Sequence, residues 1–184
     1  MQFLLDHGAQ IRFAKGAGTA LFNASPMVLA AGSGNAAILP RLRKAGDDPE
    51  STMLVAGVAP STPLLLATFW GDAEAVGSAL DAGAKVDHAD NDGMTALSWA
   101  AIGNQTAVAK LLIERGAAVN HVDRFGMTPL LYAASVDFGD SSMIDLLLKS
   151  GANPATRNKD GLTAGALVRK YGHAQFYRSL PTGP

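Results

Sequence analysis

The chain has 184 residues, with 15 Lys and Arg residues against 16 Asp and Glu residues, a formal net charge of -1 and a pI near 6.4. This balance lacks the basic stripe that binds a nucleic-acid backbone, so we expect no nucleic-acid partner. Cysteine is absent, which excludes a disulfide, a thiolate nucleophile and a cysteine-based zinc site.

The N-terminal segment does not have the pattern of a secretory signal peptide. Residues 1–8 lack a basic start and a sufficiently long apolar run. No apolar stretch of the sequence reaches about 18 residues, so we expect no membrane span. The compartment stays open, with the cytoplasm as the default where no signal peptide is visible.

Helix boundaries are marked by two recurring kinds of residue. A Ser or Thr before Pro or Ala predicts a helix start, because the hydroxyl caps a free N–H and proline fits the first turn. A glycine after an apolar run predicts a helix end, because it adopts the left-handed conformation without a clash. The predicted starts are Ser25, Thr62, Thr95, Thr128 and Thr163, and the predicted ends are Gly8, Gly46, Gly83, Gly116 and Gly151.

These marks predict one partial unit and five full helix pairs. Residues 1–8 have the pattern of the last two turns of a helix whose partner is missing, so the chain is a fragment or starts inside an array. Residues 9–24 are expected to connect this helix to the next pair, although Thr19 could begin the next helix early. Pro40 should shorten or bend a first turn. The predicted pairs are residues 25–46, 62–83, 95–116, 128–151 and 163–180.

The N-terminal end has apolar residues that no preceding unit covers. Phe3, Leu4 and Leu5 lie there, and we predict that this end frays or self-associates. The last pair carries several polar and basic residues, which suit the outer surface of a terminal cap.

The spacing of these marks repeats along the chain. Thr95 and Thr128 are 33 residues apart, and a fixed period of this length is typical of a repeat solenoid. Most connecting loops have one length, but the loop from Gly46 to Thr62 is four residues longer. Alanine-rich first helices and more apolar second helices would stack into one continuous core with a concave face. Asn104 should adopt a left-handed backbone.

The words Gly-Met-Thr-Pro-Leu at residues 126–130 and Leu-Leu-x-x-Gly-Ala at residues 147–152 resemble the ankyrin repeat. The resemblance covers about residues 25–180. It implies an all-α ankyrin-repeat solenoid of stacked helix-turn-helix units with projecting hairpin loops, as a single domain over residues 1–184. It also implies a non-catalytic scaffold that binds another protein, or another domain of its parent chain, through its concave face and hairpin tips. An alternative is the accessory ankyrin segment of a larger enzyme or sensor whose catalytic domain is not in this chain.

Two features of the family pattern need comment. Asp90 and Asp123 match the aspartate that usually ties one hairpin to the next, and Asn158 or Lys159 stands near the corresponding place in the last loop. The histidine that often follows Thr-Pro-Leu is replaced in every repeat, so we expect apolar packing to take over from its hydrogen bonds. The residues at that position are Val28, Leu65, Ser98, Leu131 and Ala166.

No residue pattern predicts catalysis, a cofactor or a metal site. His88 and His121 could form a metal or pH-sensing ladder, but neighbouring helices lie roughly 8–10 Å apart whereas zinc–nitrogen bonds are about 2.0–2.1 Å, so we interpret them as repeated hairpin-stem residues. The acids around Asp47 and Glu50 lack the pattern of a calcium loop and are expected to be solvated. No Ser/His/acid set follows from the spacing.

Aromatic, methionine and arginine side chains on the first helices and hairpin tips are the candidate binding residues. These residue types are enriched at protein interfaces. Trp99 and Tyr132 could instead pack between neighbouring first helices. The predicted protein-binding residues are Phe69, Trp70, Met94, Trp99, Ile102, Arg124, Phe125, Met127, Tyr132, Val136 and Phe138.

Overall fold

The computed structural model describes residues 25–33, 35–55, 58–136 and 140–173, together with Phe176 and Leu180. The predicted partial unit at residues 1–8, the connection over residues 9–24 and Phe138 lie outside the described residues, so the expected behaviour of the N-terminal end stays a prediction. The chain divides into two compact units, Met1–Asp90 and Asn91–Pro184. The single domain over residues 1–184 likewise stays a prediction.

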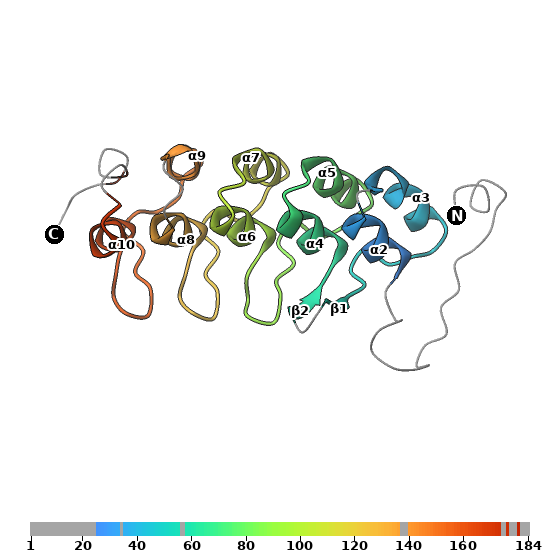
Figure 1. The fold of residues 1–184 in the computed structure, drawn as a ribbon, viewed down its shortest axis with the longest axis horizontal. Helices are drawn as coiled ribbons and strands as arrows, with labels where there is room; N and C mark the ends of the chain where they lie inside the picture. The colour runs from blue at the N-terminus through green and yellow to red at the C-terminus, as the bar shows by residue number, and fades with distance from the viewer. Residues whose placement is uncertain are drawn as a thin grey trace. The chain divides into compact units, whose positions relative to one another are not determined.

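The first unit contains two helix pairs. Helix α2 packs against α4, and the second helices form a layer above them in the view of Figure 1, with α5 in contact with α4, η1 and α3. Its elements are α2 (Pro26–Gly32), the 3-10 helix η1 (Ala36–Ile38), α3 (Leu39–Lys44), β1 (Met53–Val55), β2 (Val58–Ser61), α4 (Pro63–Trp70) and α5 (Ala73–Asp81).

Pro40 divides the second helix of the first pair, as predicted. It is the second residue of α3, and the turn before it is the separate 3-10 helix η1. Proline has no N–H to donate to the preceding turn, so a regular α-helix cannot run through this position. The two short pieces together replace the longer second helix seen in the other pairs.

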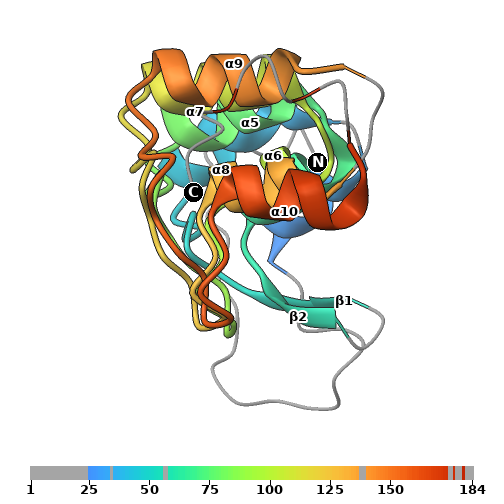
Figure 2. The ribbon, with the colours of Figure 1, turned by 90° about the vertical axis from the view of Figure 1, so that its left-hand side faces the viewer.

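The long loop between α3 and α4 forms a β-hairpin. Strands β1 and β2 pair antiparallel, with Met53 opposite Ser61 and Val55 opposite Val58. The hairpin projects away from the helical layers (Figure 2). It accounts for the extra length of this loop, and because both strands belong to a projecting loop, the predicted all-α class is confirmed.

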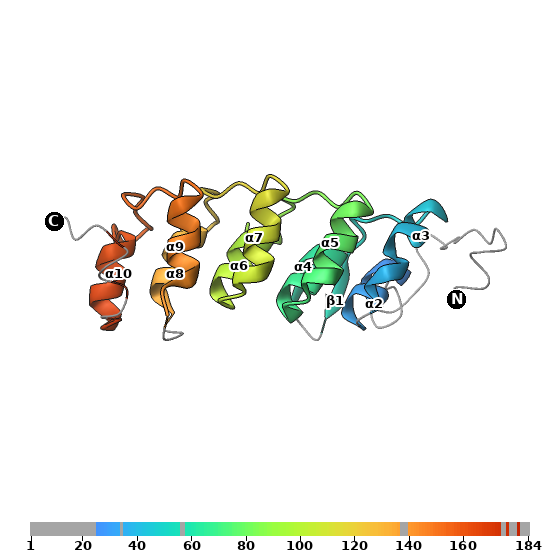
Figure 3. The same cartoon turned by 90° about the horizontal axis from the view of Figure 1, so that it is seen from above.

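The second unit repeats the same architecture. Helices α6, α8 and α10 pack side by side, and the second helices α7 and α9 cover α6 and α8 (Figure 3). The elements are α6 (Ala96–Ile102), α7 (Thr106–Glu114), α8 (Pro129–Ser135), α9 (Ser142–Lys149) and α10 (Ala164–Tyr171). The predicted second helix of the last pair is described only at His173, Phe176 and Leu180, which are all buried.

The helix boundaries confirm the predicted marks. Each of the five predicted Ser and Thr residues is an N-cap whose hydroxyl accepts the N–H of the residue three positions later. The glycines that end the second helices have φ between +90° and +99° at Gly46, Gly83, Gly116 and Gly151. Asn104 has φ +49°, the left-handed backbone expected of it.

The core also confirms the packing predicted where the family histidine is absent. Val28, Leu65, Ser98 and Leu131 are all buried. Three of the four are apolar, so the first helices are held by side-chain packing at this position. No helix among the residues that the structure describes is long and apolar enough to cross a membrane.

Candidate protein-binding surface

The loop between α7 and α8 is held in shape by one buried carboxylate. Asp123 Oδ1 accepts the backbone N–H groups of Phe125 at 2.8 Å and Met127 at 2.9 Å, and Oδ2 accepts the hydroxyl of Tyr132. The backbone N–H of Asp123 donates to the Met127 carbonyl at 3.0 Å, which closes the turn. These bonds fix the backbone on both sides of the loop tip.

The tip of this loop exposes large side chains. Phe125 is 51% exposed, Val122 is 52% exposed, and the side chain of Arg124 is 67% exposed. The loop therefore presents an aromatic ring, a branched apolar group and a guanidinium from a backbone that is already ordered.

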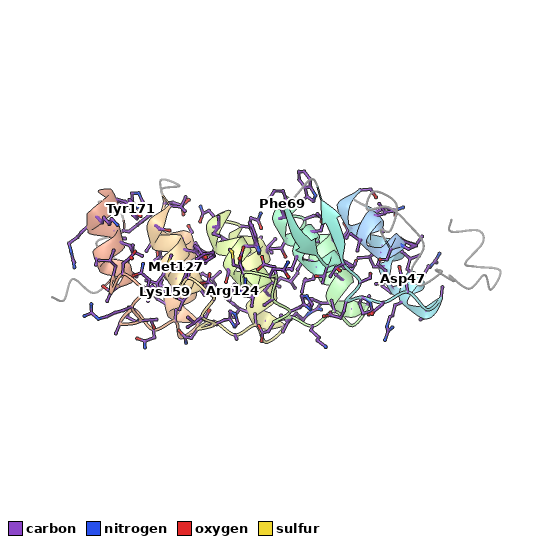
Figure 4. All side chains as sticks on the ribbon, turned by 90° about the horizontal axis from the view of Figure 1, so that it is seen from below. Asp47, Phe69, Arg124, Met127, Lys159 and Tyr171 are labelled. Carbon is purple, nitrogen blue, oxygen red and sulfur yellow. The ribbon has the colours of Figure 1, made fainter. Side chains whose placement is uncertain are left out.

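Successive hairpin tips of the second unit pack onto each other at glycines. A Cβ at Gly93 would lie 3.3 Å from the backbone nitrogen of Arg124, and a Cβ at Gly126 would lie 3.0 Å from that of Lys159. The Arg124 N–H also donates to the Asp92 carbonyl at 3.0 Å. Arg124, Met127 and Lys159 lie on the loop side of the unit (Figure 4). We refer to Val122, Arg124, Phe125 and Lys159 as the tip surface.

The role expected for Asp123 differs from the one found, and the same expectation for Asp90 stays a prediction. Asp123 ties its own loop, rather than one hairpin to the next. Asn158 takes the same place in the last loop: its Oδ1 accepts the N–H groups of Asp160 and Leu162, each at 3.0 Å. The equivalent residue is therefore Asn158 and not Lys159.

The ties between successive loops come from residues that sequence reasoning missed. Asn120 Oδ1 accepts the N–H of Asn153 at 2.8 Å, and its Nδ2 donates to the Gly151 carbonyl at 2.9 Å. In the first unit, Glu50 Oε1 accepts the N–H of Lys85 at 2.9 Å. Glu50 and Asn120 each stand four residues after a helix-ending glycine, so a polar residue at that offset was the available signal.

The two equivalent histidines have different partners. His88 Nδ1 lies 2.5 Å from Glu50 Oε2, whereas His121 Nε2 lies 2.8 Å from the Gly93 carbonyl. Both contacts hold loops in place, which agrees with the interpretation as hairpin-stem residues. Within the described ranges, no three His, Cys, Asp or Glu side chains group together in a way that could hold a metal ion.

The expectation that the acids after α3 are solvated is wrong for Asp47. Its side chain is 4% exposed, and Oδ2 accepts the N–H of Met27 at 2.8 Å at the start of α2. Burial raises the pKa of Asp47, although its hydrogen bonds from Met27 and Asp48 oppose the rise. This carboxylate joins the end of the first helix pair to its beginning.

The predicted binding residues on the helices of the second unit are less exposed than those at the tip. Trp99, Ile102 and Val136 are half-buried, along α6 and just after α8. Tyr132 is half-buried too, and its hydroxyl is committed to Asp123, so it has a structural role.

The two methionines at the hairpin tips differ from the expectation as well. Met94 is only 7% exposed, so its prediction as a contact residue is corrected to a packing residue. Met127 is half-buried, with Asn158 Nδ2 3.8 Å from its sulfur. For Met127, the side chain of Asn158 in the next loop accounts for part of this burial.

The first unit contributes a separate pair of aromatic residues. Phe69 and Trp70 end helix α4 and are 52% and 63% exposed. Their rings meet edge to face, with centroids 5.3 Å apart and planes at 82°. This aromatic pair belongs to the first unit, whereas the tip surface belongs to the second.

Hydroxyl-capped first helices, glycine-ended second helices and projecting loops define a helical-repeat protein of the ankyrin class. A model of the ankyrin-repeat family, built of three copies, matches residues 27–123 and again residues 64–158. Because these matches cover more than half of the chain, the chain belongs to the ankyrin-repeat family. Repeats of this family generally serve as protein-interaction modules.

Two curated relatives resemble part of the chain. It is 32% identical to the ankyrin repeat and KH domain-containing protein 1 of Homo sapiens over an alignment of 103 residues. This alignment covers 56% of this chain and 4% of that protein. It is 31% identical to the ankyrin repeat and KH domain-containing protein mask of Drosophila melanogaster over an alignment of 101 residues. This alignment covers 55% of this chain and 2% of that protein. The chain thus spans a very small part of the length of these relatives.

Proposed function

We propose that this chain is a non-catalytic scaffold that binds a partner protein, and that the tip surface of the second unit is its main contact. The observation that carries this proposal is the half-exposed ring of Phe125 on a loop whose backbone Asp123 already fixes. An ordered loop loses little conformational entropy on binding, so more of the contact energy appears as affinity.

The half-buried residues of the first helices would extend this contact onto the concave face. Trp99, Ile102 and Val136 are partly accessible on elements that adjoin the loop. Such residues exclude water around a central anchor, while the anchor itself supplies most of the binding energy. Phe125 is the anchor in this arrangement, and Arg124 and Lys159 form its polar rim.

The non-catalytic character is supported by the roles of the polar side chains. Asp123 accepts backbone N–H groups, His121 meets a backbone carbonyl, and His88 meets Glu50. Each of these groups holds a loop in place, which gives it a structural role.

A second candidate is an accessory ankyrin segment within a larger enzyme or sensor. The two relatives, whose names place ankyrin repeats and a KH domain in one protein and of which this chain covers 4% and 2%, support a place within a larger protein, and neither name indicates an enzyme or a sensor. The reading frame around the coding sequence tests it. A catalytic domain in the same frame supports the second candidate, and a start and stop codon flanking the 184 codons contradicts it.

The tip surface is tested by selecting binders with the whole chain. A random library of twelve-residue peptides on phage would be selected against the immobilised protein, and the affinities of the selected peptides measured by fluorescence anisotropy. Phe125→Ala should weaken binding by about 2 kcal/mol, the size of an interface hot spot. Tyr171→Ala is the matched control, since Tyr171 is equally exposed, at 50%. Equal binding by both variants would contradict the proposal.

A further inference from the structure

We infer that the aromatic pair of the first unit, Phe69 and Trp70, binds a positively charged segment of a partner protein through a Lys or Arg side chain. The two rings are more than half exposed and stand at 82° to each other, so they form two walls of an open corner. An aromatic face attracts a cation within about 6 Å of the ring centre, and tryptophan does so most strongly.

The charges near this corner are acidic. The sequence has no Lys, Arg or His between residues 51 and 84, and the acids in that stretch are Asp72, Glu74 and Asp81. Asp72 caps α5, because its Oδ1 accepts the N–H of Ala75 at 2.9 Å. Glu74 follows in the first turn of α5 and is exposed. A cation on Trp70 would therefore have a carboxylate within the next four residues of the chain.

The described elements that pack against α4 in the first unit bring no basic residue beside Trp70. Helix α2 and strand β2 carry no charged residue. Helix α3 packs on α5 and has three basic residues, Arg41, Arg43 and Lys44, all in its last turn. Since α3 and α5 run in the same direction, that turn lies at the end of the unit opposite Trp70. Figure 4 places Phe69 and Asp47, which follows α3, at opposite edges of the unit.

One exposed aromatic residue of the second unit, Tyr171, offers a comparison. Tyr171 carries the ammonium group of the neighbouring Lys170, 5.5 Å from its ring centre. The Tyr171 ring also stacks on His173, with centroids 5.8 Å apart. Lys170 thus adjoins Tyr171 in the sequence, whereas the charged residues that follow Trp70 are acids, so the charge beside Trp70 is suited to a cation from a partner.

The test uses the full chain and defined peptides. In a Trp99→Phe background Trp70 is the remaining tryptophan of the chain and reports its own surroundings. Octalysine and octaarginine are titrated while Trp70 fluorescence and amide NMR shifts are followed, beside octaglutamate and a neutral Gly-Ser octamer. Both cationic peptides should change the Trp70 emission and shift amides at residues 69–75, whereas the other two peptides should not.

Variants separate this site from general attraction to an acidic protein. Trp70→Ala and Glu74→Gln should each weaken binding of octaarginine roughly two- to fivefold, as expected for an exposed cation–π contact and its neighbouring charge. Trp70→Ala is followed by NMR alone. Glu114→Gln is the matched control, an exposed acid on α7, and should leave binding unchanged.

Three outcomes would overturn the inference. One is octaglutamate binding as well as octalysine, another is amide shifts away from residues 69–75, and the third is equal losses from Glu74→Gln and Glu114→Gln. None of these outcomes bears on the tip surface, which Phe125→Ala tests in the other unit.

Discussion

The backbone of Gly126 lies directly against the backbone of Lys159 in the next hairpin loop. A Cβ added at Gly126 would be 3.0 Å from the Lys159 nitrogen and 3.2 Å from its Cγ. The loops of the second unit are thus stacked through a position that only glycine can occupy without displacing its neighbour.

Gly126→Ala should therefore destabilise the second unit more than Gly161→Ala. The two glycines have nearly the same backbone, with φ +75° and +76°, but nothing lies within 4 Å of a Cβ at Gly161. Both variants incur the cost of a left-handed alanine, about 1–2 kcal/mol. Gly126→Ala adds an overpacking cost of about 1–3 kcal/mol. Urea denaturation measures the difference, and equal losses would mean that the loops separate freely.

Replacement of Asp123 should depend on the substitute. Asp123→Ala leaves the N–H groups of Phe125 and Met127 without their acceptor, and this should cost about 1–3 kcal/mol. Asp123→Asn should cost less, because Asn158 makes the same two bonds in the next loop. Free energies of unfolding from urea titrations compare the two variants. An Asn variant as unstable as the Ala variant would show that the negative charge, and not the acceptor, matters.

Asp47 should make the stability of the first unit depend on pH. Because burial raises its pKa above the ordinary 3.8, the folded chain holds this proton more tightly than the unfolded chain. Its stabilising contribution is complete below pH 3.8 and is lost as the pH rises through the raised pKa.

Asp47→Asn removes this titration and keeps an acceptor for the Met27 N–H. Relative to this variant, the wild type should lose free energy of unfolding as the pH increases through that window, and then stay level. Chemical denaturation at a series of pH values, with both proteins in the same buffers, measures the difference. Parallel curves would contradict the prediction.

The loss of free energy of unfolding on replacement by alanine should distinguish the exposed candidate binding residues from core residues. Phe125→Ala and Trp70→Ala should each change the free energy of unfolding by about 0.5 kcal/mol or less, since their rings contact solvent over half their surface. Leu112→Ala, at a fully buried position, should cost about 2–5 kcal/mol. Thermal melts of the three variants, compared with the wild type, measure these losses of stability. If either ring is as costly to remove as Leu112, it is a packing residue.

The helices of this chain could be predicted because their boundaries are local. Thr62, Thr95 and Thr128 cap their helices through a residue three positions away, so the signal and the contact lie in the same short segment. The same is true of Asn104, whose left-handed backbone is a property of the residue itself. Loop length indicated an irregularity before Thr62, but not that residues 53–61 form a hairpin.

The burial of Asp47 and the bonding partners of the loop ties could not be predicted because these contacts join distant segments. Asp47 reaches Met27 across 20 residues, and Glu50 reaches His88 across 38. Nothing in the residues around Asp47 distinguishes it from a solvated acid until the second helix has returned to the first. For the candidate site, the exposure of Phe125 and Arg124 agrees with their expected place at a hairpin tip, whereas the burial of Met94 could not be inferred from residue type.

The contact between successive hairpins also determines how this protein can change. At Gly93 and Gly126 the closest atoms of the neighbouring loop are the backbone nitrogens of Arg124 and Lys159, and of these two side chains only the Cγ atoms are among the nearest atoms, at 3.7 Å and 3.2 Å, so this contact constrains the side chains little beyond Cγ. The tips can therefore accept new side chains while the glycines beneath them stay constant. To redirect this repeat protein to another partner, positions 124, 125 and 159 would be substituted, and Gly93 and Gly126 would be kept.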